Sequence, residues 1–208
     1  HPYSSLGPDR VLSAVESTGL CCDGHLLALN SYENRVYQVG LEGGGFVVAK
    51  FYRPMRWSEA QIREEHDFLR ELAEAELPVI APLTDEAGDS LHWSEPFLYA
   101  VFPRRGGRLP ELDFDTLHQM GQVLGKLHAV GSVRAFKARP TLSLVGHGEQ
   151  SRSFLLQHDF IPDDMRRAYE TLSADLLRRA APLLAQPMKR LRLHGDCHLG
   201  NILWRDGP

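Results

Sequence analysis

Eight consecutive residues near the end of the chain carry the residue types that a phosphoryl-transfer reaction requires. They read His194-Gly195-Asp196-Cys197-His198-Leu199-Gly200-Asn201. At this spacing an aspartate can accept the proton of an attacking hydroxyl, while an asparagine five positions later holds a magnesium ion. A second metal-binding carboxylate is expected after such a loop, and the sequence ends at Pro208. The spacing therefore predicts Asp196 as the catalytic base and Asn201 as a magnesium ligand, with the second ligand beyond Pro208.

A lysine and a glutamate far from this loop form a second candidate pair. Lys50 ends the run Phe46-Val47-Val48-Ala49-Lys50, whose composition is typical of a β-strand. Glu65 falls near the centre of the apolar face of a helix predicted over 58–75, where a carboxylate must find a cation or be costly to bury. Taken singly, each residue would be explained by a position at the surface. A strand lysine followed by a helix glutamate is, however, the order in which kinases form an ion pair at the nucleotide phosphates, so we expect Lys50 and Glu65 to pair.

The first part of the chain is predicted to be rich in strands. These are expected at 26–30, 35–39, 46–52, 91–93 and 97–102. A short helix is expected over 9–17, and the longer helix over 58–75 begins with a capping box of Ser58 and Gln61. Gly43-Gly44-Gly45 lacks the Lys-Ser or Lys-Thr pair and the helix that a P-loop requires, so it is predicted to be a hairpin turn.

The remainder of the chain is predicted to be mainly helical. The stretch Pro103-Arg104-Arg105-Gly106-Gly107 is rich in turn residues and marks the best domain boundary. Beyond it, helices are expected over 115–130 and 162–184, with a loop over 139–150. We therefore predict an α+β fold of two lobes. The N-terminal lobe, an antiparallel sheet with a helix, covers 1–102, and part of a mainly helical C-terminal lobe covers 103–208.

Composition and charge argue against several classes of protein. The 208 residues carry a net charge of −4 and no basic cluster of the kind that binds nucleic acid. No apolar run approaches the length needed to cross a bilayer, so membrane insertion is not expected. The three cysteines include the adjacent Cys21 and Cys22, which do not make a disulfide framework. The expectation is a cytoplasmic protein, and the pattern specifies no oligomeric state.

Several segments resemble known families. The form His-Gly-Asp at 194–196 resembles the catalytic loop of the aminoglycoside phosphotransferase and choline kinase group of protein-kinase-like folds, whereas ordinary protein kinases have His-Arg-Asp. Closer similarity is found in 29–37, 48–54 and 191–208, which resemble the bacterial stress response kinase A family. The resemblance spans nearly the whole chain, and its first and last segments are the more specific ones.

The resemblance implies a phosphotransferase with a protein-kinase-like fold that uses ATP and Mg²⁺, with the nucleotide bound between the two lobes. By position, Asp196 would accept the proton of the substrate hydroxyl and Asn201 would coordinate magnesium. Lys50 would contact the nucleotide phosphates, and Glu65 would hold this lysine in place. The family phosphorylates serine and threonine of proteins, including itself, in bacterial envelope-stress responses. A protein substrate and the chain itself are thus the implied partners.

Two more residues would complete the ATP site by the same resemblance. Ser31, with its neighbours 32–34, would face the nucleotide in place of a glycine-rich lid, since the chain has no such motif there. Backbone groups near Phe102 would meet the adenine at the hinge between the lobes.

Three other functions stay open at this point. A kinase of the same fold could act on a small alcohol such as an aminoglycoside, choline or a homoserine-like compound, because the aspartate does the same work for any hydroxyl. A pseudokinase scaffold could bind ATP without transferring phosphate. The ligand types at His194, Asp196, Cys197 and His198 could instead belong to a metal-binding module, but residues so close in sequence do not easily converge on one ion, and no distant His/Cys cluster completes the set.

The chain on its own is expected to be inactive or nearly so. Phosphoryl transfer relies on metal ions to neutralise charge on the phosphates, and one of the two expected protein ligands is not part of this sequence. An assay with radiolabelled ATP that compares this chain with a longer form of the protein tests the expectation. Turnover comparable to that of the longer form would refute it.

Overall fold

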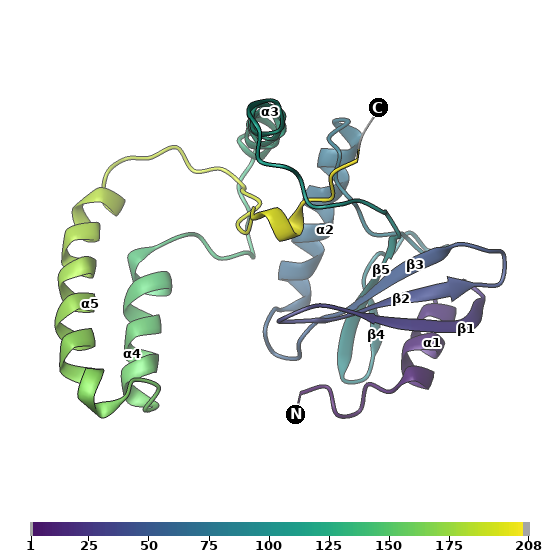
Figure 1. Cartoon of the computed structure of the whole chain (residues 1–208), viewed down its shortest axis with the longest axis horizontal. Helices are drawn as coiled ribbons and strands as arrows, with labels where there is room; N and C mark the ends of the chain where they lie inside the picture. Colours follow the sequence, from purple (N-terminus) through teal and green to yellow (C-terminus); the bar gives the residue numbers. More distant parts are fainter. Residues whose placement is uncertain (1, 206–208) are drawn as a thin grey trace. The chain divides into compact units, whose positions relative to one another are not determined.

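The computed structural model describes residues 2–205 and contains a five-stranded antiparallel sheet (Figure 1). Its strands are β1 (Cys22–Leu29), β2 (Arg35–Leu41), β3 (Phe46–Phe51), β4 (His92–Ser94) and β5 (Phe97–Pro103). They lie in the order β1-β2-β3-β5-β4. All the strands predicted from the sequence are present, although the first begins earlier, at Cys22.

Strands β2 and β3 are joined by the glycine-rich turn. The amide of Leu41 donates to the carbonyl of Gly45 at 3.2 Å, and the amide of Gly44 donates to the carbonyl of Leu41 at 2.8 Å. Gly44 and Gly45 have φ angles of 82° and 86°, a region that glycine tolerates because it has no Cβ. The predicted hairpin turn is confirmed.

The side chains of β3 divide between the two faces of the sheet. Val47, Ala49 and Phe51 are buried in a core that includes residues of α1 (Pro8–Glu16). Lys50 lies on the opposite face, because successive strand residues point to opposite sides. On that face Ile62 of α2 (Glu59–Glu74) packs in a buried cluster with residues of the sheet. Lys50 thus projects toward the side of the sheet that α2 covers.

Helix α2 contacts both the sheet and α3 (Phe114–Gly131). It begins with the predicted capping box, in which the amide of Gln61 donates to Ser58 Oγ at 3.3 Å and the amide of Ser58 donates to Gln61 Oε1 at 2.9 Å. Farther along, Phe68 is buried in a cluster with Leu127 of α3. The helix is therefore fixed at its first turn by its own cap and later by packing.

The chain divides into two compact units. The described residues of the first unit are 2–138 together with 191–205, and those of the second unit are 139–190. The first unit also contains a 3₁₀ turn, η2 (Leu199–Asn201). The second contains a π-helical turn, η1 (Val145–Glu149), followed by α4 (Gln150–Gln157) and α5 (Asp163–Leu184). The lobe boundary predicted at residue 102 is not tested by this division and stays a prediction. Within residues 2–205, no helix combines the length and the apolar composition needed to cross a bilayer.

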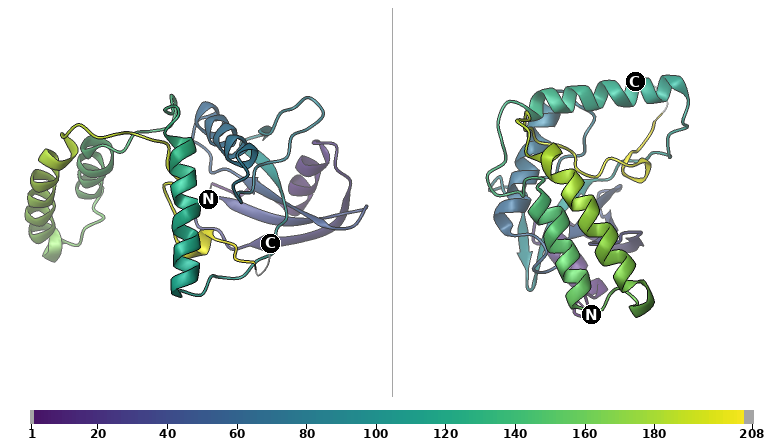
Figure 2. Two further views of the ribbon diagram at one scale, coloured as in Figure 1. Left: turned by 90° about the horizontal axis from the view of Figure 1, so that it is seen from above. Right: turned by 90° about the vertical axis from the view of Figure 1, so that its left-hand side faces the viewer.

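Helices α4 and α5 lie side by side (Figure 2). The helix predicted over 162–184 is confirmed as α5, whereas the loop predicted over 139–150 is wrong from Val145 onward. Helix α4 has no side-chain N-cap, and its Arg152 instead donates to Ser173 Oγ of α5 at 2.8 Å. A helix this short depends on such tertiary contacts rather than on local signals, which explains why the sequence pattern misses it.

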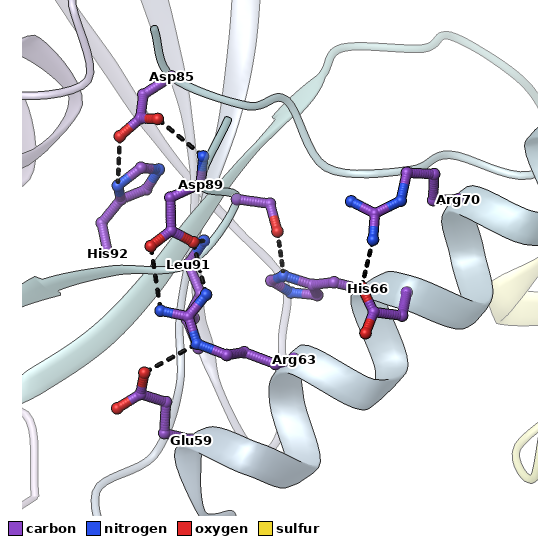
Figure 3. Close-up of polar contacts among 10 residues, drawn as sticks. Glu59, Arg63, His66, Arg70, Asp85, Asp89, Leu91 and His92 are labelled. Carbon is purple, nitrogen blue, oxygen red and sulfur yellow. Dashed lines mark hydrogen bonds and ion pairs between the residues drawn. The ribbon is translucent and has the colours of Figure 1, made fainter. Parts of the chain in front are cut away.

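Polar contacts attach α2 to the segment that precedes β4 (Figure 3). Arg63 donates two hydrogen bonds to Asp89, at 2.5 and 3.1 Å, and a third to Glu59 at 2.8 Å. The hydrogen bonds from Arg63 lower the pKa of Asp89 to about 2. The first half of the helix is thereby held against residues 85–92.

A buried histidine forms another of these contacts. His66 Nε2 lies 2.8 Å from the hydroxyl of Tyr52, and Nδ1 lies 3.0 Å from Ser90 Oγ. The side chain is 2% exposed, and burial lowers its pKa from 6.5 to about 4. The imidazole is therefore neutral in the folded protein at neutral pH, because a buried cation would lose its hydration.

Acidification is expected to destabilise the fold through His66. The unfolded chain takes up this proton near pH 6.5 but the folded protein only near pH 4, so the stability is complete above 6.5 and is lost as pH falls through this window. The pKa difference corresponds to roughly 3 kcal/mol once both states have taken up the proton. Thermal unfolding of the wild type and of His66→Gln between pH ~7 and ~4.5 measures it. The wild type should lose more stability than the variant, and an equal loss would contradict the assignment.

Candidate active site

The pair expected between strand lysine and helix glutamate is present. Lys50 Nζ lies 3.5 Å from Glu65 Oε1, and both side chains are partly buried. The ammonium group also lies 4.6 Å from the centre of the Tyr52 ring, a cation–π distance. Lys50 pairs in register with Val36 of β2 and Ala100 of β5, so its backbone is held on both sides within the sheet. The cation is therefore positioned by a rigid element and oriented by a carboxylate.

The loop 194–201 is organised by its own hydrogen bonds. Asn201 Nδ2 donates to the carbonyl oxygen of Asp196 at 2.8 Å and to its carboxylate Oδ2 at 3.0 Å. The amide of Asp196 donates to His194 Nδ1 at 3.3 Å, and Gly195 between them has a φ of 79°. His198 caps η2 by accepting the amide of Gly200 at 3.1 Å. The carboxylate of Asp196, 76% exposed, is thus oriented by Asn201 while it faces solvent.

The oxygen atoms of this loop suit a hard divalent cation. With Nδ2 of Asn201 bonded to Asp196, Oδ1 points away from it and accepts no hydrogen bond from the described residues. Amide and carboxylate oxygens are the ligands that magnesium prefers. No group of three or more His, Cys, Asp and Glu side chains within 2–205 is arranged to hold a metal ion. The second magnesium ligand predicted beyond Pro208 lies outside the described residues.

Ser31 lies in the turn between β1 and β2. Its hydroxyl donates to the carbonyl of Asn34 at 3.0 Å, so its proton is used inside the turn. Glu33 accepts hydrogen bonds from Arg56 Nε at 3.1 Å and from Trp57 Nε1 at 3.0 Å, which ties the turn to the segment after β3. The role expected for Ser31 toward a nucleotide stays a prediction.

Phe102 lies near the end of β5. It pairs in register with Val48 and lies on the same face as Lys50, two residues beyond the partner of that lysine. Its ring packs edge to face with His66 of α2, with 6.2 Å between ring centres. The predicted hinge position thus adjoins the sheet face that carries Lys50.

The segment after β5 pairs with the segment after the loop. Arg108 and Trp204 exchange two backbone hydrogen bonds, of 3.0 and 2.9 Å. An open pocket of about 590 Å³ adjoins this bridge, and its lining consists of Arg104, Arg105, Gly106, Gly107, Arg108, Trp204 and Arg205. None of the predicted site residues lines this pocket. The bridge joins the predicted hinge region to the segment that follows loop 194–201.

Two residues that the sequence reasoning missed connect the loop to α2. Arg192 Nη1 and Nη2 donate to the two carboxylate oxygens of Glu71, at 3.1 and 2.7 Å. The side chain of Arg192 is 3% exposed, and its guanidinium lies 4.2 Å from the ring centre of Phe68. Burial lowers the pKa of Arg192, and the charge of Glu64 opposes this shift. Because Arg192 is the buried partner and Glu71 is partly exposed, loss of Glu71 is the costly change: it would leave the charge of Arg192 buried without its carboxylate.

The backbone of Arg192, like its side chain, is fixed by hydrogen bonds, and these go to the end of α3. Its amide donates to the carbonyl of Gly131, the last residue of α3, at 3.1 Å, and Nη2 donates to the carbonyl of Val130 at 3.2 Å. A Cβ on Gly131 would lie 2.2 Å from the carbonyl oxygen of Arg192, so only glycine allows this approach. Residues 191–193 form the lead-in to loop 194–201. A hint was present in the sequence, since the arginine between Leu191 and Leu193 interrupts this otherwise apolar lead-in.

Comparison with known proteins finds relatives over the whole chain. A family model described as "Phosphotransferase enzyme family" matches residues 25–208. Serine/threonine protein kinase RdoA of Salmonella typhimurium is 42% identical over 207 residues, which make up 99% of this chain and 63% of that protein. Stress response kinase A of Escherichia coli K12 is 40% identical over the same shares. The resemblance inferred from the sequence is confirmed, and the chain spans about 63% of the length of these relatives.

Solved structures share the fold at low sequence identity. An amicoumacin kinase in complex with AMP-PNP, Ca²⁺ and Ami has a TM-score of 0.73 at 19% identity, covering 92% of this chain and 59% of that one. Spectinomycin phosphotransferase APH(9)-Ia, in complex with ADP and spectinomycin, has a TM-score of 0.67 at 17% identity, covering 95% of this chain and 65% of that one. The predicted α+β, protein-kinase-like fold is confirmed.

Gly131→Ala is expected to destabilise this chain by about 1–3 kcal/mol, because the new methyl group would collide with the backbone of Arg192. Gly125→Ala on the same helix is the matched control, since a Cβ there meets nothing within 4 Å. The control should gain about 0.5–1 kcal/mol from helix propensity. Urea unfolding of both variants measures the difference, and equal effects would contradict the close approach.

Proposed function

The chain belongs to the phosphotransferase enzyme family, and on that premise we propose that it acts in an ATP-dependent kinase that phosphorylates serine and threonine of proteins. The observation that carries the proposal is that two pairs, Lys50–Glu65 and Asp196–Asn201, are both formed within one compact unit. These pairs supply the cation and the carboxylate that phosphoryl transfer to a hydroxyl needs.

Lys50 would bind the phosphates of ATP. Its ammonium group is held by Glu65 and carried by the central part of the sheet, so little freedom is lost when a phosphate arrives. The adenine would lie against backbone groups near Phe102, on the same face of the sheet. The turn that contains Ser31 would cover the phosphates mainly through backbone amides, because the proton of the Ser31 hydroxyl already bonds Asn34.

Asp196 would act as the base. Asn201 holds one carboxylate oxygen, which leaves the other exposed to accept the proton of a serine or threonine hydroxyl. As that proton moves to Asp196, the hydroxyl oxygen bonds to the γ-phosphorus and the bond from this phosphorus to the ADP oxygen breaks. Asn201 Oδ1 would hold Mg²⁺, which neutralises charge on the phosphates when bound.

The choice of a protein as acceptor rests on the relatives. Those that are 40–42% identical are named as a serine/threonine protein kinase and as stress response kinase A. The amicoumacin kinase and the spectinomycin phosphotransferase share the fold but less than a fifth of the sequence, so their substrates carry less weight here.

Incubation of the full-length protein with ATP and magnesium, followed by mass spectrometry, tests the class of substrate. Phosphoserine or phosphothreonine on the protein itself is the expected result. Phosphate transferred only to small alcohols would point to a small-molecule kinase, and ATP binding without transfer would point to a pseudokinase.

Asp196→Ala in the full-length protein should lower kcat by about 10²–10⁴-fold and leave nucleotide affinity nearly unchanged, since the base acts only in the chemical step. Lys50→Ala should weaken both nucleotide binding and turnover. Lys126→Ala, an exposed lysine on α3, serves as the control and should change neither. Steady-state kinetics and titration with a fluorescent ATP analogue separate the two effects. If Asp196→Ala kept most of its rate, the assignment of the base would be wrong.

A further inference from the structure

Helix α2 holds both halves of the candidate site. Glu65 on this helix binds Lys50 of β3, and Glu71 on the same helix binds Arg192, four residues before Asp196. Six residues of α-helix separate the two glutamates, a rise of about 9 Å along a rigid axis. A displacement of α2 would therefore move two carboxylates at the same time: that of Glu65, which orients Lys50, and that of Glu71, which holds the lead-in to the loop.

The contacts at Arg192 define its position closely. The guanidinium binds Glu71 through two nitrogens and lies against Phe68, while the backbone amide binds Gly131 at the end of α3. Arg134 makes a further ion pair with the same carboxylate. Because side chain and backbone are both fixed, the lead-in cannot slide along α2 without breaking several contacts at once.

Stability alone would not favour an ion pair at the contact between Arg192 and Glu71. A buried ion pair can often be replaced by apolar residues of similar volume without loss of stability. Nε of Arg192 is buried and has no hydrogen-bond partner among the described residues, so part of its hydrogen-bonding capacity is given up. What an arginine–carboxylate pair with two parallel hydrogen bonds does provide is a defined distance and angle between the two segments.

We propose that Arg192 is a positioning residue: through its ion pair with Glu71 it sets the place of the Asp196 loop relative to Lys50, with α2 as the connecting element. The proposal rests on the proposed kinase function. The side chain of Arg192 is buried against Glu71 and Phe68, so its loss should misplace the base in the chemical step while the nucleotide anchor, Lys50 with Glu65, stays formed.

Three variants of the full-length protein test this role. Glu71→Gln keeps the shape but removes the charge, Arg192→Lys keeps the charge but loses the paired hydrogen bonds, and Glu71→Met/Arg192→Met replaces the pair by apolar side chains. Each should lower kcat at least about tenfold, because small misplacements of reacting groups are costly. Each should leave KM for ATP within about twofold. Glu74→Gln and Arg70→Lys, at exposed positions of the same helix, are the matched controls and should keep wild-type kinetics.

The doubly substituted variant separates positioning from simple stabilisation. We expect it to stay folded, with a melting temperature near that of the wild type, and to turn over slowly. If it turned over like the wild type, or if kcat in all three variants fell only in proportion to the folded fraction, the pair would be a packing feature and the proposal would be overturned.

A second readout covers the case in which the wild type transfers no phosphate. That result would defeat the proposed function, and the connection between α2 and the loop would then be judged by amide hydrogen exchange. Exchange at 194–201 should rise in Glu71→Gln while that of β3 stays unchanged, and unaltered exchange in the loop would overturn the positioning role.

Discussion

The arrangement of the candidate site depends on one ion pair between residues that are 121 positions apart, the buried Arg192 and the partly buried Glu71. A charge removed from water must be paired, and the buried guanidinium of Arg192 reaches its carboxylate only when residues 191–193 lie against α2. Gly131 allows the backbone of Arg192 to come close enough for this. The pair therefore selects one placement of the loop among the many that apolar packing alone would tolerate.

Helix α2 carries three glutamates that face three different parts of the chain. Glu64 accepts the backbone amides of Lys137 and Ala138, Glu65 binds Lys50, and Glu71 binds Arg192. Each carboxylate lies at least partly out of water and is satisfied by donors from a segment distant in sequence. Helix α2 thus becomes the element to which three segments are attached: strand β3, residues 137–138 and the lead-in to loop 194–201.

The two halves of the site differ in how they are held. Lys50 sits within the sheet between two neighbouring strands, and its orientation depends on a partner from another element. Asp196 sits in an exposed loop and is oriented by Asn201, His194 and a glycine with positive φ, all from the same short segment. The lysine is thus fixed by tertiary contacts, whereas the aspartate is ordered by hydrogen bonds within its own loop.

The amino-acid sequence by itself determined the parts of the site whose contacts are local. The capping box of α2 spans three residues and was predicted from its spacing. The spacing also singled out Asp196 and Asn201, five residues apart, although the hydrogen bonds between them come from the structure. The pair of Lys50 with Glu65 was anticipated from the place of Glu65 on an apolar helix face, together with the kinase-like order of strand and helix. Only the tertiary structure decided that Arg192 meets Glu71 and that residues 150–157 form a helix against α5. The reason is physical: such contacts depend on which face of an element a distant segment reaches. The residue pattern within either segment does not specify that contact, so it cannot be predicted from the sequence.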